Sequence, residues 1–230
     1  MENKNIWNKY DTNEERELWQ LNEGYKAYLN RGKTERECVA ETVAMARERG
    51  YRDLDEIVAR GEALKAGDKV YAVNMKKSVA LFVVGNKPLA EGMNILGAHI
   101  DSPRLDIKQN PLFEDTELAY LDTHYYGGIK KYQWVAQPMA IHGVVVKKDG
   151  TTVLVNVGEN EDDPVFFVSD LLIHLAGEQL EKKAAKVIEG EALDLIVGHM
   201  PLKDTEKEAV TAGVLKILKE TYDIEEADFL

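Results

Sequence analysis

The sequence is poor in cysteine and proline, and it contains no long apolar run. Its 230 residues include one cysteine, Cys38, and six prolines. A single cysteine excludes an internal disulfide framework and suits a reducing compartment, where we expect Cys38 to be a small core residue. A hydrophobic content of 44% excludes a disordered chain. No apolar run approaches the roughly 18 residues of a membrane span, so no membrane partner is expected.

Basic residues are also under-represented. The chain has 29 Lys+Arg against 41 Asp+Glu, a formal net charge of −12. Nucleic-acid affinity comes mainly from Lys and Arg neutralising phosphates, so the composition argues against a nucleic-acid partner. The first residues are polar and acidic and lack the apolar core of a signal peptide. We therefore expect a soluble, cytoplasmic protein with a sizeable core.

Two helices are predicted at the start of the chain. Apolar and aromatic residues at helical spacing indicate a helix over 12–30, ended by Gly32. Thr34 and Glu37 are spaced as a capping box, in which each side chain binds the other residue's backbone N–H. The second helix begins there and ends at Gly50.

After these helices, apolar residues tend to recur at every second position instead of at helical spacing. Residues 69–73 and 78–84 read as strands, and the short apolar segment 93–99 reads as a third, central strand. Helices followed by strands that end in a polar motif indicate the opening of an α/β sheet domain.

The pattern of predicted elements changes after residue 105, which indicates a second domain. We therefore divide the chain into domains 1–105 and 106–230. Strands are predicted over 118–124, 134–147 and 152–157, and helices over 169–186 and 205–222. Lys148-Asp-Gly150 is typical of a hairpin turn. Ser169 and Thr205 are suitable N-caps for the two helices.

The motif with the clearest chemistry is Gly97-Ala-His99-Ile-Asp101-Ser-Pro-Arg104. The predicted strand delivers His99 at its carboxyl end, where open α/β sheets place their ligands. Residues two apart in an extended segment face the same side, so Asp101 can approach one ring nitrogen of His99. A metal-bound histidine needs such a carboxylate to fix its tautomer and raise its basicity.

Other interpretations of these residues remain open. A lone histidine at a strand end is more often structural, and no His-Glu-x-x-His or Cys-x-x-Cys pattern completes a metal site. Ser102 lacks the Gly-x-Ser-x-Gly surroundings of a nucleophile. Tyr126-Gly-Gly-Ile129 lacks the Lys-Ser/Thr of a phosphate loop and suits a turn. His174, on a predicted amphipathic helix, reads by itself as a surface or boundary residue.

Taken together, the motifs resemble the aspartyl aminopeptidase family of two-metal metallopeptidases, and its bacterial branch most closely. The matching stretches are 33–37, 67–71, 97–106, 123–134, 163–166 and 170–175. They follow the family's order over nearly the whole chain. The resemblance implies an α/β fold: the start of a three-layer metallopeptidase catalytic domain over 1–105, then a β-rich inserted dimerisation domain with helices over 106–230.

The resemblance also implies roles for three residues. His99 matches the first ligand of a two-zinc centre, with cobalt or manganese as alternative metals, and Asp101 matches the carboxylate that supports this ligand. His174 matches a histidine on the insert that reaches the active site of a neighbouring subunit. The implied assembly is a homo-oligomer of dimers that builds to a dodecamer.

The activity implied by the resemblance is removal of an N-terminal residue from a peptide. Two metals would polarise the scissile carbonyl and activate a water, and a carboxylate would act as general base. Named family members prefer acidic residues, whereas a net charge of −12 repels acidic peptides at long range, so the substrate side chain stays open.

The family's chains are about twice as long as this one and carry the other ligands and the catalytic Glu in their second half. We therefore expect this chain alone to be inactive. Glu225, Glu226 and Asp228 read as a helix exit rather than as ligands. The alternative is a catalytically inactive fragment that acts only as an assembly module through residues 106–230. A hydrolase with another mechanism would need a nucleophile that the sequence does not show.

Overall fold

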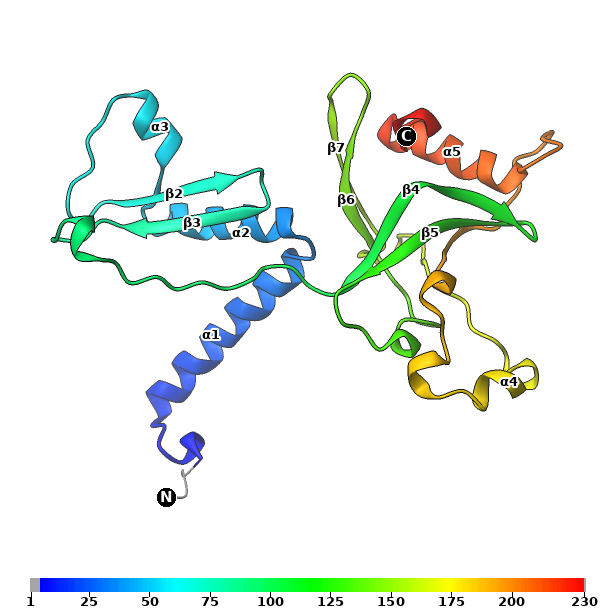
Figure 1. The fold of residues 1–230 in the computed structure, drawn as a ribbon, viewed down its shortest axis with the longest axis horizontal. Coiled ribbons are helices and arrows are strands. Elements are labelled where there is room, and N and C mark those ends of the chain that lie inside the picture. Colours follow the sequence, from blue (N-terminus) through cyan, green and yellow to red (C-terminus); the bar gives the residue numbers. More distant parts are fainter. Residues whose placement is uncertain (1–4, 230) are drawn as a thin grey trace. The chain divides into compact units, whose positions relative to one another are not determined.

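The structure, a computed structural model, describes residues 5–229. The chain forms two compact units, Met1–Ser102 and Pro103–Leu230 (Figure 1). Their boundary lies close to the predicted one between residues 105 and 106. The functional roles that the sequence assigns to the two stretches stay predictions.

Helices begin the first unit, as predicted. They are α1 (Thr12–Arg31), α2 (Glu35–Glu48) and the short α3 (Leu54–Ala59), preceded by a 3-10 turn (Ile6–Asn8). The predicted capping box of Thr34 and Glu37 is confirmed at the start of α2. Gly50, with a φ of +83°, follows the end of α2 in the left-handed region. Cys38 is 5% exposed and belongs to the core, as expected.

The sheet of the first unit has the order β1-β2-β3. Its strands are β1 (Arg52–Asp53), β2 (Lys69–Asn74) and β3 (Ser78–Val83). β2 runs parallel to β1 and antiparallel to β3. The α2 helix packs on β2 and β3 (Figure 1). Tyr71, buried on β2, accepts a hydrogen bond of 2.8 Å from Arg47 Nε of α2, which ties the helix to the sheet.

The third strand predicted in this unit, over 93–99, is wrong. The segment has no regular secondary structure. Its apolar side chains are exposed, Ile95 by 82% and Leu96 by 101%. A strand is stable only when a neighbouring strand satisfies its backbone groups, and no strand of residues 5–229 pairs with this segment. The apolar pattern alone therefore did not decide the conformation.

The second unit is mainly β-structure. A sheet of order β4-β5-β8 contains β4 (Arg104–Asp115), β5 (Leu118–Tyr126) and β8 (Leu195–Gly198), and a separate hairpin contains β6 (Ile141–Val146) and β7 (Thr152–Val157). All these pairings are antiparallel. A core cluster of Phe166, Val168, Ile188, Leu193 and Leu195 packs beside β5 and β8. Two helices, α4 (Gly177–Leu180) and α5 (Ala209–Tyr222), complete the unit.

The strands of this unit were predicted in part. The predicted strands over 118–124 and 152–157 are confirmed, as is the hairpin turn, where Gly150 has a φ of +85°. The predicted strand over 134–147 is too long, because the positive φ of Ala136 and the following Pro138 interrupt the extended chain before β6.

The predicted helix over 169–186 is also wrong. The segment contains a 3-10 turn (Ile173–Leu175), the four-residue α4 and a second 3-10 turn (Ala184–Lys186). Its apolar residues Leu171, Leu172, Ile173 and Leu175 are exposed. A helix of this length depends on packing of its apolar face, and among the described residues nothing buries that face.

The last helix, α5, begins four residues later than its predicted start. Thr205 is not its N-cap: Glu208 occupies that position with a left-handed backbone and no capping side chain. Glu114 of β4 instead accepts hydrogen bonds of 2.9 Å from the backbone N–H groups of Val210 and Thr211. A carboxylate that is distant in sequence thus caps the helix, which a local pattern cannot reveal.

Candidate metal-ligand site

His99 and Asp101 form a local hydrogen-bonded pair at the end of the first unit. His99 Nδ1 lies 3.0 Å from Asp101 Oδ1 and 3.0 Å from the Asp101 carbonyl oxygen. Both oxygens are acceptors, so Nδ1 carries the proton and donates it. In the neutral ring, Nε2 then keeps its lone pair. The His99 side chain is 84% exposed, so this nitrogen is accessible to a ligand from solvent.

The sequence predicted this contact between the two side chains, although the strand expected to create it does not form. A spacing of two residues was sufficient to bring the Asp101 carboxylate to the ring. The arrangement is the one that orients a metal-binding histidine and fixes its tautomer. The roles of metal ligand and supporting carboxylate stay predictions.

The residues present do not complete a zinc centre. Zinc sites in proteins use three or four side-chain ligands. Among residues 5–229, no three His, Cys, Asp or Glu side chains come together in a way that would hold a metal ion. His99 therefore offers one ligand atom, and no catalytic step through a metal follows from this chain's geometry.

His174 lies in the second unit, on the 3-10 turn Ile173–Leu175, and its side chain is exposed. Exposed apolar side chains surround it in sequence, namely Leu171, Leu172, Ile173 and Leu175. A group of exposed apolar side chains of this kind is typical of a contact surface for another protein. The predicted role at a neighbouring active site is compatible with this position and stays a prediction.

Arg104 anchors the start of β4, immediately after the His99 motif. Its Nε donates to Asp106 Oδ1 at 2.6 Å, and its guanidinium lies 4.2 Å from the ring centre of Tyr126. Tyr126 is opposite Arg104 in the β4–β5 register. Sequence reasoning missed this cluster. Its members belong to two of the stretches that carry the family resemblance, 97–106 and 123–134, and the structure brings these stretches together.

A cluster of charged groups surrounds Lys108 in the second unit. Lys108 Nζ lies 2.8 Å from Asp122 Oδ1 and 2.7 Å from Glu191 Oε2. The hydrogen bond from Lys108 lowers the pKa of Glu191. Burial, followed by the charge of Asp122, raises the pKa of Asp194. The ammonium occupies the place where a cation would bind, so this cluster is held together by its own lysine.

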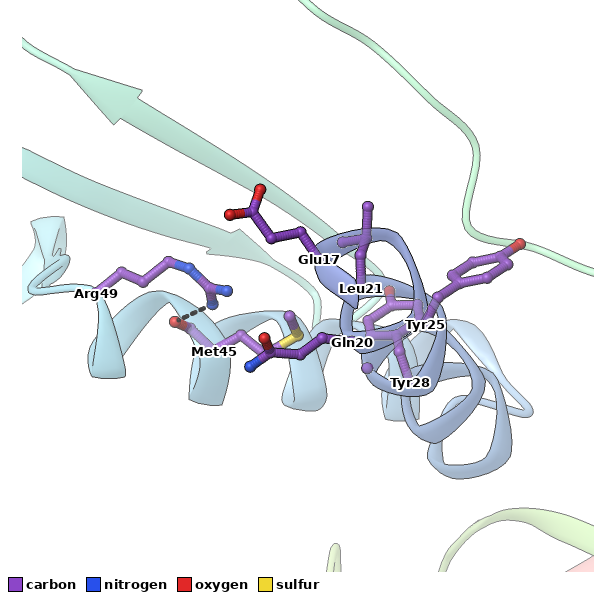
Figure 2. Close-up of a pocket in the computed structure, with 8 residues that line it drawn as sticks. Glu17, Gln20, Leu21, Tyr25, Tyr28, Met45 and Arg49 are labelled. Carbon is purple, nitrogen blue, oxygen red and sulfur yellow. Dashed lines mark hydrogen bonds between the residues drawn. The ribbon is translucent and has the colours of Figure 1, made fainter. Parts of the chain in front are cut away.

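A groove with a volume of about 520 Å³ lies between α1 and α2 (Figure 2). Eight residues line it: Glu17, Gln20, Leu21, Gly24, Tyr25, Tyr28, Met45 and Arg49. None of them belongs to the His99 motif, and the lining contains no histidine, cysteine or serine. The groove therefore has the chemistry of a binding surface rather than of a catalytic centre.

A mixed α/β fold with a histidine–carboxylate pair at the exit of its first unit is compatible with a metal-dependent hydrolase, in which such a carboxylate orients a histidine ligand. The family of aminopeptidase I zinc metalloproteases (M18) matches residues 28–230, and the chain belongs to this family. The predicted family resemblance is thus confirmed at the level of M18. No described helix has the length and apolarity needed to cross a membrane.

Known relatives support the same assignment. The chain is 60% identical over 230 residues to a probable M18 family aminopeptidase 1 of Clostridium acetobutylicum, covering 100% of this chain and 50% of that protein. The crystal structure of aminopeptidase I from Clostridium acetobutylicum matches 98% of this chain and 50% of that one, with a TM-score of 0.86 and 60% identity.

The M18 aminopeptidase crystal structure from Thermotoga maritima matches with a TM-score of 0.90 and 44% identity, over 100% of this chain and 49% of that one. The chain thus spans about half the length of the relatives it matches. These similarities confirm the predicted α/β fold.

Proposed function

We propose that this chain is part of a zinc-dependent aminopeptidase that removes N-terminal residues from peptides. The observation that carries the proposal is the His99–Asp101 pair, in which Nδ1 is held at 3.0 Å by a carboxylate. The pair lies within the region that matches a family of zinc metalloproteases. Zinc would be the metal, two ions in a complete site, with cobalt or manganese as alternatives.

Each predicted site residue has one role in this proposal. His99 Nε2 would bind the metal, and Asp101 would hold the ring in the tautomer that leaves Nε2 free for it. His174 would act at the active site of a neighbouring subunit in a homo-oligomer. The exposed apolar side chains beside it, Leu172, Ile173 and Leu175, support a protein contact there.

The chain alone should be inactive, because its described residues complete no metal site. We expect the purified chain to hold less than one zinc per molecule and to hydrolyse no aminoacyl chromogenic substrate with added Zn²⁺ or Co²⁺. Turnover that His99→Ala abolishes would contradict this expectation. A zinc-free, dimeric chain without activity is also what the alternative, an assembly module, predicts.

A chimera separates the two interpretations. The chain would be joined in one polypeptide to the second half of the Clostridium acetobutylicum relative, with which it shares 60% identity. We expect this chimera to bind zinc and to release N-terminal residues, and we expect His99→Ala to abolish both. A folded chimera that binds zinc but cleaves no N-terminal residue would refute the proposed activity. A panel of acidic, neutral and basic N-terminal residues would establish the substrate preference.

A further inference from the structure

A loop over residues 169–192 leaves the body of the second unit and returns to it (Figure 1). It contains no regular element longer than the four-residue α4. Its two ends meet where the backbone N–H of Ile196 donates to the Phe167 carbonyl oxygen at 2.9 Å. The loop carries His174 and the exposed apolar side chains beside it. The contacts at the base of this loop therefore control how far His174 can move.

Residues 190–194 close the base of the loop by packing on β5, and we call them the closing segment. Thr123 Oγ1, on a buried residue of β5, donates to the Leu193 carbonyl oxygen at 2.6 Å. Gly190 lies so close to the ring of Tyr125 that an added Cβ would stand 2.6 Å from a ring carbon. These two contacts hold the closing segment directly against the strand.

The closing segment ends in a carboxylate that lacks a donor. Asp194 Oδ1 is buried and has no hydrogen-bond partner among the described residues. The Asp122 carboxyl of β5 lies within hydrogen-bonding reach of Asp194. Two ionised carboxylates at such a separation repel each other, and neither has a hydrogen to donate. A single proton between them would remove the repulsion and supply the missing donor.

We propose that Asp122 and Asp194 share one proton and that this proton holds the closing segment on β5. The proton comes from solvent and returns to it as the pH changes. With the proton present, the two carboxyls form an O–H···O hydrogen bond and the base of the loop is closed. Without it, two like charges face each other and the segment separates more readily from the strand. The pKa of Asp194, raised first by burial and then by Asp122, agrees with this arrangement.

Charged groups of the neighbouring elements also act on this pair. Lys108 Nζ of β4 lies 2.8 Å from Asp122 Oδ1 and 2.7 Å from Glu191 Oε2. The pKa of Glu191 is lowered first by its hydrogen bond from Lys108 and to a smaller extent by the charge of His124 on β5. One ammonium thus pairs with two carboxylates. The third carboxylate, Asp194, depends on the proton.

The direction of the pH dependence follows from this balance. Because the pKa of Asp194 is raised, the shared proton is present in acid and is lost as the pH rises through that value. The pKa of Glu191 is lowered, so its bond with Lys108 persists until the pH falls below the ordinary value of a glutamate. The base of the loop should therefore be closed most firmly in mild acid. A consequence for catalysis through His174 rests on the proposed function, whereas the closure of the loop does not.

The first test measures hydrogen exchange of the loop backbone in the 230-residue chain by mass spectrometry. Asp194→Asn is the main variant, because its amide places an N–H where the shared proton would lie. Comparing variant and parent at the same pH removes the effect of pH on the intrinsic exchange rate. We expect similar rates at about pH 4, and about three- to tenfold faster exchange of residues 185–194 in the parent at about pH 8. The β6–β7 hairpin should exchange equally in both proteins.

Two control variants identify the titrating group. Glu189→Gln removes an exposed carboxylate next to the closing segment and should leave the pH dependence of exchange as in the parent. His124→Gln removes the imidazole, which titrates near neutral pH, and should also keep the pH dependence. A pH dependence that His124→Gln abolishes would assign the effect to the histidine and overturn the proposal.

The second test observes the proton directly, by carbon NMR of the chain with labelled aspartate carboxyls. The Asp194 signal is identified by its absence in Asp194→Asn. We expect Asp194 to titrate above the ordinary value of about 3.9. Titration at or below that value, or equal exchange of parent and Asp194→Asn at every pH, would overturn the proposal. Neither measurement uses peptidase activity, so loop closure and the proposed function are tested separately.

Discussion

Lys147, directly after β6, donates a hydrogen bond of 2.6 Å to the carboxylate of Asp223, the residue that ends α5. The contact joins two elements that are 76 residues apart in sequence. Lys219 approaches the other oxygen of the same carboxylate, also at 2.6 Å. The two lysines lower the pKa of Asp223 to about 2. This carboxylate thus connects the hairpin to the last helix.

Asp223 should make the second unit acid-sensitive. Its pKa in the folded chain is about 2, below the ordinary value of about 3.9. Its ionised form therefore adds stability above the ordinary value, and this stability is lost as the pH falls towards 2. Asp223→Asn, which tolerates the left-handed backbone, should lower the urea midpoint at neutral pH and differ less from the parent in acid. Glu220→Gln, in a looser exposed pair, is the control.

Asp194 should have the opposite effect on how stability depends on pH. Burial and the nearby Asp122 raise its pKa, so the folded chain disfavours its ionised form. One of its oxygens is buried without a hydrogen-bond partner. The penalty is complete above the folded pKa, shrinks as the pH falls below it, and is gone below the ordinary pKa of an aspartate. Asp194→Asn should therefore raise the urea midpoint at neutral pH. An unchanged midpoint there would show that Lys108 already offsets the charge.

Lys108 pairs with two carboxylates, and its removal should expose the repulsion between them. Lys108→Met keeps the length of the stem but leaves Asp122 and Glu191 without their shared ammonium, which lies within 2.8 Å of both. We expect a lower melting temperature, and we expect lower pH to restore part of the loss because it protonates the carboxylates. Lys216→Met, from an exposed pair with Glu220, should have little effect.

The sequence predicted the elements whose signals are local. The α1 and α2 helices, the β2–β3 pair and the β6–β7 turn follow from spacing, capping residues and glycine positions within a few neighbours. The His99–Asp101 contact was predictable for the same reason, since its two residues are two apart. The segment 93–99 failed because a strand also needs a partner, which no pattern within the segment supplies.

Other elements depend on residues far away in sequence. β4 was missed because Asn110, with a φ of +50°, and Pro111 interrupt the alternation at a register shift, where a buried proline is tolerated. The start of α5 depends on Glu114, nearly one hundred residues before it. The Arg104–Tyr126 contact needs the β4–β5 register. These features follow from tertiary pairing and are visible only in the structure.

Glu114 should contribute as much to the free energy of unfolding as an N-cap residue does. It accepts from the N–H groups of Val210 and Thr211, two donors that α5 itself leaves unsatisfied. Glu114→Ala should lower the free energy of unfolding by about 1–2 kcal/mol, the range of a lost N-cap with its charge–dipole contribution. Glu114→Gln keeps one acceptor oxygen and should lose less. Equal losses in the two variants, measured by urea unfolding, would show that the negative charge of the carboxylate carries the whole effect.

The last prediction concerns the two residues of the candidate metal site, measured in the chimera with the second half of the Clostridium relative. His99→Ala removes the ligand atom and should abolish zinc binding at that position. Asp101→Asn keeps an oxygen 3.0 Å from Nδ1 but removes the charge that raises the basicity of the ring. Zinc affinity should then fall about 10- to 100-fold, as for other residues that orient metal ligands.

A further variant, Asp101→Ala, tests which oxygen of Asp101 orients the ring. If the backbone carbonyl alone does so, Asp101→Ala should lower the zinc affinity no more than Asp101→Asn, because that carbonyl also lies 3.0 Å from Nδ1. A greater loss in Asp101→Ala would assign orientation to the side chain, and unchanged affinity in all three variants would remove His99 from the metal site.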